Sequence, residues 1–175
     1  MIDPMLLITV GIGIAFLLIL IDRINRGLSV LVFSSTLLIF TIASGVYFYV
    51  IVNGGGLIES VNAGIAAPIG INFRIGLEEA AIMLCVNLLM TFSALYLSKR
   101  FRETTVAGMV LFLMMTVGIN GVIMTRDLFN MFVFIEIFSI ATYSFIALDR
   151  DRETLTAGFK YIRHPAWCLS NASGF

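Results

Sequence analysis

The chain has 175 residues, of which 59% are hydrophobic and 13% charged, and its formal net charge is zero. Soluble globular proteins are typically about a quarter charged, so this composition, with a mean hydropathy of +1.02, excludes an ordinary soluble domain. We expect a membrane protein in contact with the lipid bilayer, with no nucleic-acid partner.

Five apolar runs are each long enough to cross a bilayer, which takes about 20 residues. They cover residues 5–21, 28–52, 80–97, 106–124 and 128–148. The first run resembles a signal peptide in length, but no basic segment precedes it, so we read it as a retained helix. The predicted fold class is therefore all-α: a polytopic transmembrane bundle of about five helices over residues 1–148, followed by a tail over residues 149–175.

The basic residues predict the orientation of these helices, because cytoplasmic loops of membrane proteins are enriched in Lys and Arg. With the N-terminus outside and the C-terminus inside, nine of the eleven Lys and Arg fall on the inner side and two on the outer side. The inner set is Arg23, Arg26, Lys99, Arg100, Arg102, Arg150, Arg152, Lys160 and Arg163, and the outer set is Arg74 and Arg126. This asymmetry also supports the count of five helices. We expect a multi-pass protein of the plasma membrane.

The longest connection, residues 53–79, is rich in glycine. Its start, Asn-Gly-Gly-Gly at 53–56, predicts the end of the second helix and a turn. Residues 69–75 alternate apolar and polar side chains and favour a short strand or hairpin. Glu78 and Glu79 then stand where the third helix begins and complement its dipole.

Polar residues one turn apart occur inside the third and fourth predicted helices. Asn87 and Thr91 form one such pair, and Thr116 and Asn120 form the other. We interpret these positions as packing surfaces, with Gly118 and Gly121 allowing a neighbouring helix to approach Asn120 closely.

Cys85 and Cys168 show no metal-ligand or disulfide spacing. No metal site, cofactor-binding motif or catalytic residue is predicted, and whether the chain takes part in an enzyme stays open.

The fourth and fifth predicted helices are joined by only three residues, which requires an antiparallel pair in contact. Asp127 suits the N-cap of the fifth helix, where its carboxylate accepts a backbone N–H. A role in ion entry is the alternative. We expect the Arg126 side chain to extend to the outer interface.

Glu136 is the only ionisable residue of the fifth predicted helix. A carboxylate near the middle of a membrane costs roughly 2.5–3.5 kcal/mol on insertion scales and usually faces protein or water on an ion path. Glu136 lies on one helical stripe with Ser139 and Tyr143. These three side chains predict a polar track that supports proton transfer, although Ser139 and Tyr143 equally suit hydrogen bonding between helices.

The residues from Thr125 to Tyr143 read Thr-Arg-Asp-Leu-Phe-Asn-Met-Phe-Val-Phe-Ile-Glu-Ile-Phe-Ser-Ile-Ala-Thr-Tyr. This segment resembles the antiporter-like, proton-conducting subunits of respiratory complex I, membrane-bound hydrogenases and Mrp-type sodium/proton antiporters, with the D-type Mrp branch the nearest. Two further segments resemble the same family, Pro68-Ile-Gly-Ile-Asn-Phe and Ala157-Gly-Phe-Lys-Tyr-Ile. The resemblance extends to about Ile162.

The resemblance implies that Glu136 is the fifth-helix glutamate of the proton path, which in the family pairs with a lysine on the seventh helix. Asp127, Ser139 and Tyr143 are further candidates for that path. It implies partners as well: other membrane subunits of a multisubunit complex, and protons or sodium as the transported ions. Any redox chemistry would belong to partner subunits of NADH dehydrogenase-like or hydrogenase-like complexes.

Family members have roughly fourteen helices, whereas five are predicted here. The partner lysine is absent, and Lys160 does not replace it because it follows the fifth helix. From about residue 163 the tail, which includes His164 and Pro165, departs from the family pattern. Two explanations are open: a frameshift that truncated an ordinary subunit, which we favour, or a short subunit completed by another chain. We expect an N-terminal fragment or short form of a proton or sodium/proton translocating subunit that does not pump alone. The alternative functions are a structural or assembly subunit that moves no ions, or an unrelated small channel.

Overall fold

The computed structural model describes residues 3–61, 72–103 and 105–148, and within them five helices are long and apolar enough to cross a membrane. They are α1 (Pro4–Asp22), α2 (Arg26–Val50), α3 (Leu77–Tyr96), α5 (Val106–Met124) and α6 (Leu128–Ile146). All five predicted spans are confirmed, with ends that differ by up to three residues. The predicted tail, residues 149–175 with Lys160 and His164, lies outside the described residues.

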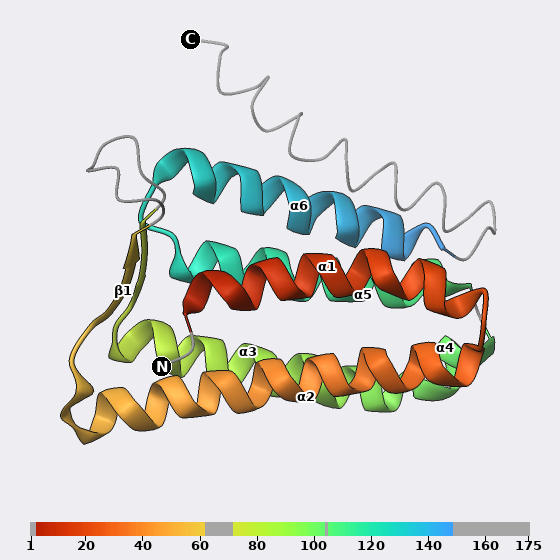
Figure 1. The fold of residues 1–175 in the computed structure, drawn as a ribbon. Helices are drawn as coiled ribbons and strands as arrows, with labels where there is room; N and C mark the ends of the chain where they lie inside the picture. The colour runs from red at the N-terminus through yellow and green to blue at the C-terminus, as the bar shows by residue number, and fades with distance from the viewer. Residues whose placement is uncertain (1–2, 62–71, 104, 149–175) are drawn as a thin grey trace, which may run out of the picture.

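The helices run side by side, alternating in direction, as Figure 1 shows. Helix α1 packs against α2 and α5, α2 packs against α3, and α6 packs against α5. The outermost element of the described fold is α6, which contributes few side chains to the apolar core, chiefly Phe134. One face of α6 is therefore uncovered by the other described helices.

A two-stranded antiparallel sheet covers one end of the bundle (Figure 1). It consists of β1 (Ile58–Val61) and β2 (Asn72–Ile75), with Ile58 opposite Ile75. Both of these side chains are buried against the helices. The hairpin predicted around residues 69–75 is confirmed for its described part, and the fold is mostly helical rather than all-α.

The predicted helix stop after α2 is also present. One turn of π-helix, Ile51–Gly55 (η1), continues α2. Gly54 and Gly56 then adopt φ angles of 87° and 68°. This left-handed backbone region is open to glycine at little steric cost, so the chain turns here toward β1.

A short helix that the sequence analysis did not predict, α4 (Ser98–Glu103), joins α3 to α5 at the opposite end of the bundle. It is anchored by Phe101, whose side chain is only 3% exposed. The Phe101 ring lies 5.2 Å from that of Phe33 on α2, 5.7 Å from Phe112 on α5 and 6.3 Å from Phe145 on α6, measured between ring centroids. Edge-to-face and tilted aromatic contacts of this kind stabilise packing beyond the area they bury.

Candidate functional site

Two glycines on α5 determine how α6 lies in the bundle. A Cβ atom added to Gly121 would stand 2.3 Å from the Phe134 ring, and one added to Gly118 would stand 3.0 Å from the backbone nitrogen of Phe138. Only glycine leaves room for α6 at this separation. The prediction that these glycines allow close approach is confirmed, but they serve α6, whereas Asn120 faces α3.

Glu136 lies on the opposite side of α6 from this contact. At 3.6 residues per turn, Phe134, Phe138 and Ala141 share the face that packs on α5, and Glu136 is half a turn from them. Its side chain is exposed. Within the described residues it makes no hydrogen bond or ion pair. The large side chains around it are exposed as well: Phe129, Phe132 and Ile140. In the described fold, the Glu136 carboxylate therefore points away from α5 and the other helices of the bundle.

The predicted polar track is present as a stripe of positions. Ser139 and Tyr143 follow Glu136 on the same side of α6 and are half-buried. No hydrogen bond among the described residues joins Glu136 to Ser139. The neighbouring Thr142 hydroxyl instead donates to the carbonyl of Phe138 (2.7 Å) on its own helix. The structure thus brings the three predicted groups to one face of α6.

Asp127 caps the N-terminus of α6. One carboxylate oxygen accepts the Phe129 backbone N–H (3.3 Å), and the other accepts the Asn130 side-chain N–H (3.0 Å). An N-cap of this kind satisfies a backbone donor that the first turn would otherwise leave unpaired. The N-cap prediction is confirmed, and the ion-entry role stays a prediction.

Arg126 forms an ion pair with Glu79 at the start of α3 and remains half-exposed. Its extension to the outer interface stays a prediction. The other Glu79 oxygen accepts the Gly76 backbone N–H (2.9 Å). A single carboxylate therefore both caps α3 and fastens the α5–α6 connection to it. Thr125 adds a backbone bridge to Phe73 of β2, so the hairpin holds the same connection.

The polar residues of α3 and α5 meet in a buried amide pair. The Asn87 Nδ2 donates to Asn120 Oδ1 (3.0 Å), and the Asn120 Nδ2 donates to Asn87 Oδ1 (2.8 Å). Both side chains are at most 1% exposed. The Thr91 hydroxyl lies 2.8 Å from that of Thr41 on α2, which extends the contact to a third helix. These positions are packing surfaces, as predicted.

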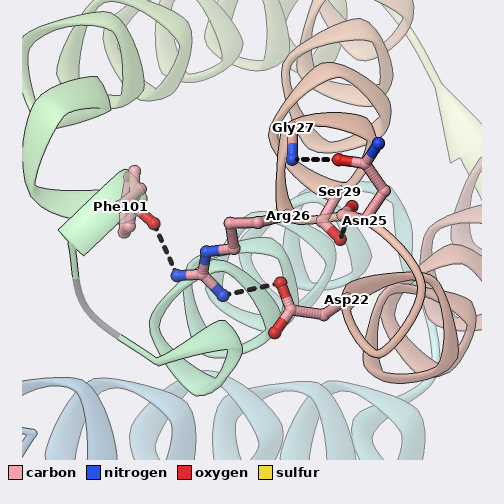
Figure 2. A network of polar contacts seen from close by, with 6 residues as sticks. All are labelled: Asp22, Asn25, Arg26, Gly27, Ser29 and Phe101. Atoms are coloured by element: carbon pink, nitrogen blue, oxygen red, sulfur yellow. Dashed lines mark hydrogen bonds and ion pairs between the residues drawn. The ribbon is translucent and has the colours of Figure 1, made fainter.

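Arg26 joins three elements at the end of the bundle opposite the hairpin. One guanidinium nitrogen donates to the Asp22 carboxylate (2.7 Å) and another donates to the Phe101 carbonyl (2.7 Å). Figure 2 shows the guanidinium between these two acceptors. This contact is not predicted from the sequence, because Asp22 ends α1 and Arg26 begins α2, and Phe101 lies 75 residues away along the chain.

No group of three or more His, Cys, Asp or Glu side chains gathers within the described residues in a way that would hold a metal ion. Among the described residues, Glu136 is an exposed carboxylate in the middle of α6, on the face turned away from α5.

Comparison with known proteins identifies relatives. The chain is 44% identical over 45 residues to the D-type subunit of the Na⁺/H⁺ antiporter of Alkalihalophilus pseudofirmus, which is 26% of this chain and 9% of that protein. It is 34% identical over 73 residues to the N-type subunit of the NADH-quinone oxidoreductase of Desulforudis audaxviator, which is 42% of this chain and 14% of that protein. No family model matches the chain.

Two solved structures share the fold over 91% of this chain. A chain of the membrane-bound sulfane sulfur reductase, an archaeal respiratory membrane complex, superposes with a TM-score of 0.84 at 30% identity, and 33% of it is covered. A chain of the Mrp complex from Dietzia sp. superposes with a TM-score of 0.80 at 23% identity, and 30% of it is covered. The predicted resemblance to antiporter-like membrane subunits is confirmed, and the chain spans about a third or less of each of these four proteins.

Proposed function

We propose that this chain forms the first five-helix part of an antiporter-like subunit that translocates protons, or protons and sodium, with Glu136 as the carboxylate of the proton path. The relatives named as subunits of an Na⁺/H⁺ antiporter and of an NADH-quinone oxidoreductase support this proposal. The similar solved structures are complexes, so the proposed partners are other membrane subunits.

The observation that carries the proposal is the position of Glu136. In the described residues it is the only Asp, Glu, Lys, Arg or His that lies more than three residues from the ends of a spanning helix. A carboxylate facing lipid at that depth is costly. A face of α6 that holds such a group is therefore suited to a covering of protein or water, and groups of this kind mark ion and proton pathways in membrane proteins.

Ser139 and Tyr143 extend this route along α6 in the proposal. Successive turns of a helix are 5.4 Å apart, so a water molecule between each pair of groups would complete a hydrogen-bonded chain. Asp127, about two and a half turns before Glu136, would stand at the mouth of the path while it caps the helix.

The proposed orientation places the N-terminus outside and residue 148 inside, in the plasma membrane. Its support is the Lys and Arg distribution in the sequence, nine against two. Accessibility of single cysteines to a membrane-impermeant maleimide tests it in intact cells, at Glu78→Cys for the outer end and Lys99→Cys for the inner end. Both are made in a Cys85→Ser/Cys168→Ser background. Labelling only at position 99 would overturn the orientation.

The function is tested by proton uptake into inverted membrane vesicles that hold the native complex. We expect Glu136→Gln to abolish most of the uptake and Glu136→Asp to retain part of it, because only the aspartate keeps an ionisable group. Glu78→Gln, which removes an exposed carboxylate outside the middle of the membrane, serves as the matched control and should pump normally.

The same experiment separates the second candidate, a structural or assembly subunit. The buried contacts of α2, α3 and α5 would serve that role equally well. If Glu136→Gln and Glu136→Ala assemble normally and pump at the wild-type rate, the proton-path role is refuted and the structural role is favoured.

A further inference from the structure

Charge is divided between the two ends of the described bundle. At the end formed by α4 and the α1–α2 turn, which we call the basic end, the charged positions are Asp22, Arg23, Arg26, Lys99, Arg100, Arg102 and Glu103. At the hairpin end they are Asp3, Glu59, Arg74, Glu78, Glu79, Arg126 and Asp127. The first set carries five cations and two anions, and the second carries two cations and five anions.

The cations of the basic end stand close to the ends of the spanning helices. Arg23 directly follows α1, Lys99 is three residues beyond the end of α3, and Arg102 is four residues before the start of α5. Four residues of helix rise about 6 Å. The headgroup layer on each side of the hydrocarbon is about 5–8 Å deep. These positions therefore fall at the depth of lipid phosphates.

The Arg26 contact fixes where α4 lies. Its guanidinium binds the Phe101 carbonyl from one side and the Asp22 carboxylate from the other (Figure 2). The Phe101 ring is buried among aromatic rings of α2, α5 and α6. The backbone and the side chain of Phe101 are thus held independently, and the three basic positions of α4 belong to a helix that is fixed in place.

The same contact removes an obstacle to anion binding. Asp22 is the nearest anion to Arg23 in the sequence, and its charge is compensated by Arg26 at 2.7 Å. Arg23 and Lys99 both have exposed side chains. Arg26 itself is engaged by protein acceptors, so its role is to position the surface.

We propose that the basic end, through the exposed side chains of Arg23 and Lys99, is a binding surface for the phosphates of anionic phospholipid headgroups, with Arg26 as its positioning residue. Juxtamembrane clusters of Lys and Arg attract anionic lipids, at about a fivefold gain in affinity for each charge. The depth of the cations favours a membrane lipid over a soluble anion.

The test uses the full-length protein, purified in mild detergent together with the subunits that accompany it. It is exchanged into mixed micelles of dioleoylphosphatidylglycerol and dioleoylphosphatidylcholine, and the lipid that it retains is measured by native mass spectrometry. We expect the wild type to retain phosphatidylglycerol preferentially, and this preference to fall as salt is raised. The double variant Arg23→Gln/Lys99→Gln should weaken the preference by roughly 25-fold.

The matched control is Arg74→Gln/Arg126→Gln, which removes the same charge from the hairpin end and should retain the preference. Equal losses in the two double variants, or no preference in the wild type, would overturn the proposal. Competition by millimolar inorganic phosphate that is as effective as added phosphatidylglycerol would assign the surface to a soluble anion instead.

Arg26→Lys tests the positioning role at constant charge. An ammonium group cannot present the planar fork that reaches both acceptors. We expect a partial loss of lipid preference in a protein that still assembles. Full retention of the preference in Arg26→Lys would overturn the positioning role of Arg26.

Discussion

The buried amide pair between α3 and α5 gives a quantitative prediction. Each asparagine donates to the other, and Asn120 Nδ2 also donates to the Thr116 carbonyl (2.7 Å). Hydrogen bonds between membrane helices average about 0.6 kcal/mol and reach about 1.7 kcal/mol. Two reciprocal bonds therefore predict a coupling energy of about 1–2 kcal/mol between Asn87 and Asn120. We expect this coupling in a cycle of Asn87→Ala, Asn120→Ala and the double variant.

The assay is reversible unfolding of the purified protein by titration with sodium dodecyl sulfate in mixed micelles. The free energy of unfolding of each single variant should fall by about 2–3 kcal/mol, since the substitution leaves a buried amide group unsatisfied. The double variant should lose less than the sum of the two.

The control cycle pairs Asn120→Ala with Ser29→Ala. Ser29 is buried near the start of α2, at the basic end, whereas Asn120 lies fourteen residues, or about 21 Å of helix, from the start of α5 at that same end. The changes in unfolding free energy caused by mutations at distant sites add to within about 0.3–0.5 kcal/mol. A coupling for the asparagine pair no larger than this would refute the argument that the reciprocal bonds hold α3 and α5 together.

Two further predictions concern the position of α6. Gly121→Ala should lower the free energy of unfolding by about 1–3 kcal/mol, because its new methyl would overlap the Phe134 ring and overpacking is destabilising. The control is Gly13→Ala, where a Cβ meets nothing within 4 Å, and this variant should be neutral or stabilising in the same titration. Equal effects of the two variants would contradict the packing argument. Glu79→Ala should lower the free energy of unfolding more than Arg126→Ala does, because Glu79 also accepts a backbone N–H at the start of α3. A half-exposed ion pair alone contributes at most about 1 kcal/mol. A larger loss for Arg126→Ala would contradict this prediction.

The sequence allowed the spans and the caps to be predicted because both depend on local chemistry. A helix of about 20 apolar residues is long enough to cross the hydrocarbon core of a bilayer, whichever helices pack against it. An aspartate before an apolar run caps its first turn, as Asp127 does. The stop at residues 53–56 was equally local, since Gly54 and Gly56 supply the backbone conformation that ends the helix.

What the sequence left open depends on which helix packs against which. The pairing of Asn87 with Asn120 and of Glu79 with Arg126 joins residues 33 and 47 positions apart. Apolar residues are distributed nearly evenly around α5, so the sequence does not indicate which face of α5 packs against α3 and which against α6. Helix α4 was missed because six residues with four charges resemble a loop until the burial of Phe101 is seen.

The candidate site was predicted in part. Helical periodicity placed Glu136, Ser139 and Tyr143 on one side of α6, and the structure has them there. It could not indicate that this side is the one turned away from α5, since that choice is made by Gly118 and Gly121 together with Phe134 and Phe138.

The glycine contact between α5 and α6 has a consequence for how mutations in this chain should be interpreted. The outward direction of Glu136 is fixed by two positions that carry no side chain and lie on another helix. In a saturation mutagenesis experiment that selects for transport, Gly118 and Gly121 should tolerate almost no replacement, although neither has any group that can carry a proton. Smaller residues at position 134 should suppress replacements of Gly121, whose new Cβ would meet the Phe134 ring. Replacements of Gly118 should have no such suppressor at position 138, because the new Cβ would meet the backbone of Phe138. A genetic map of this protein would then mark the two glycines that orient Glu136 as clearly as Glu136 itself.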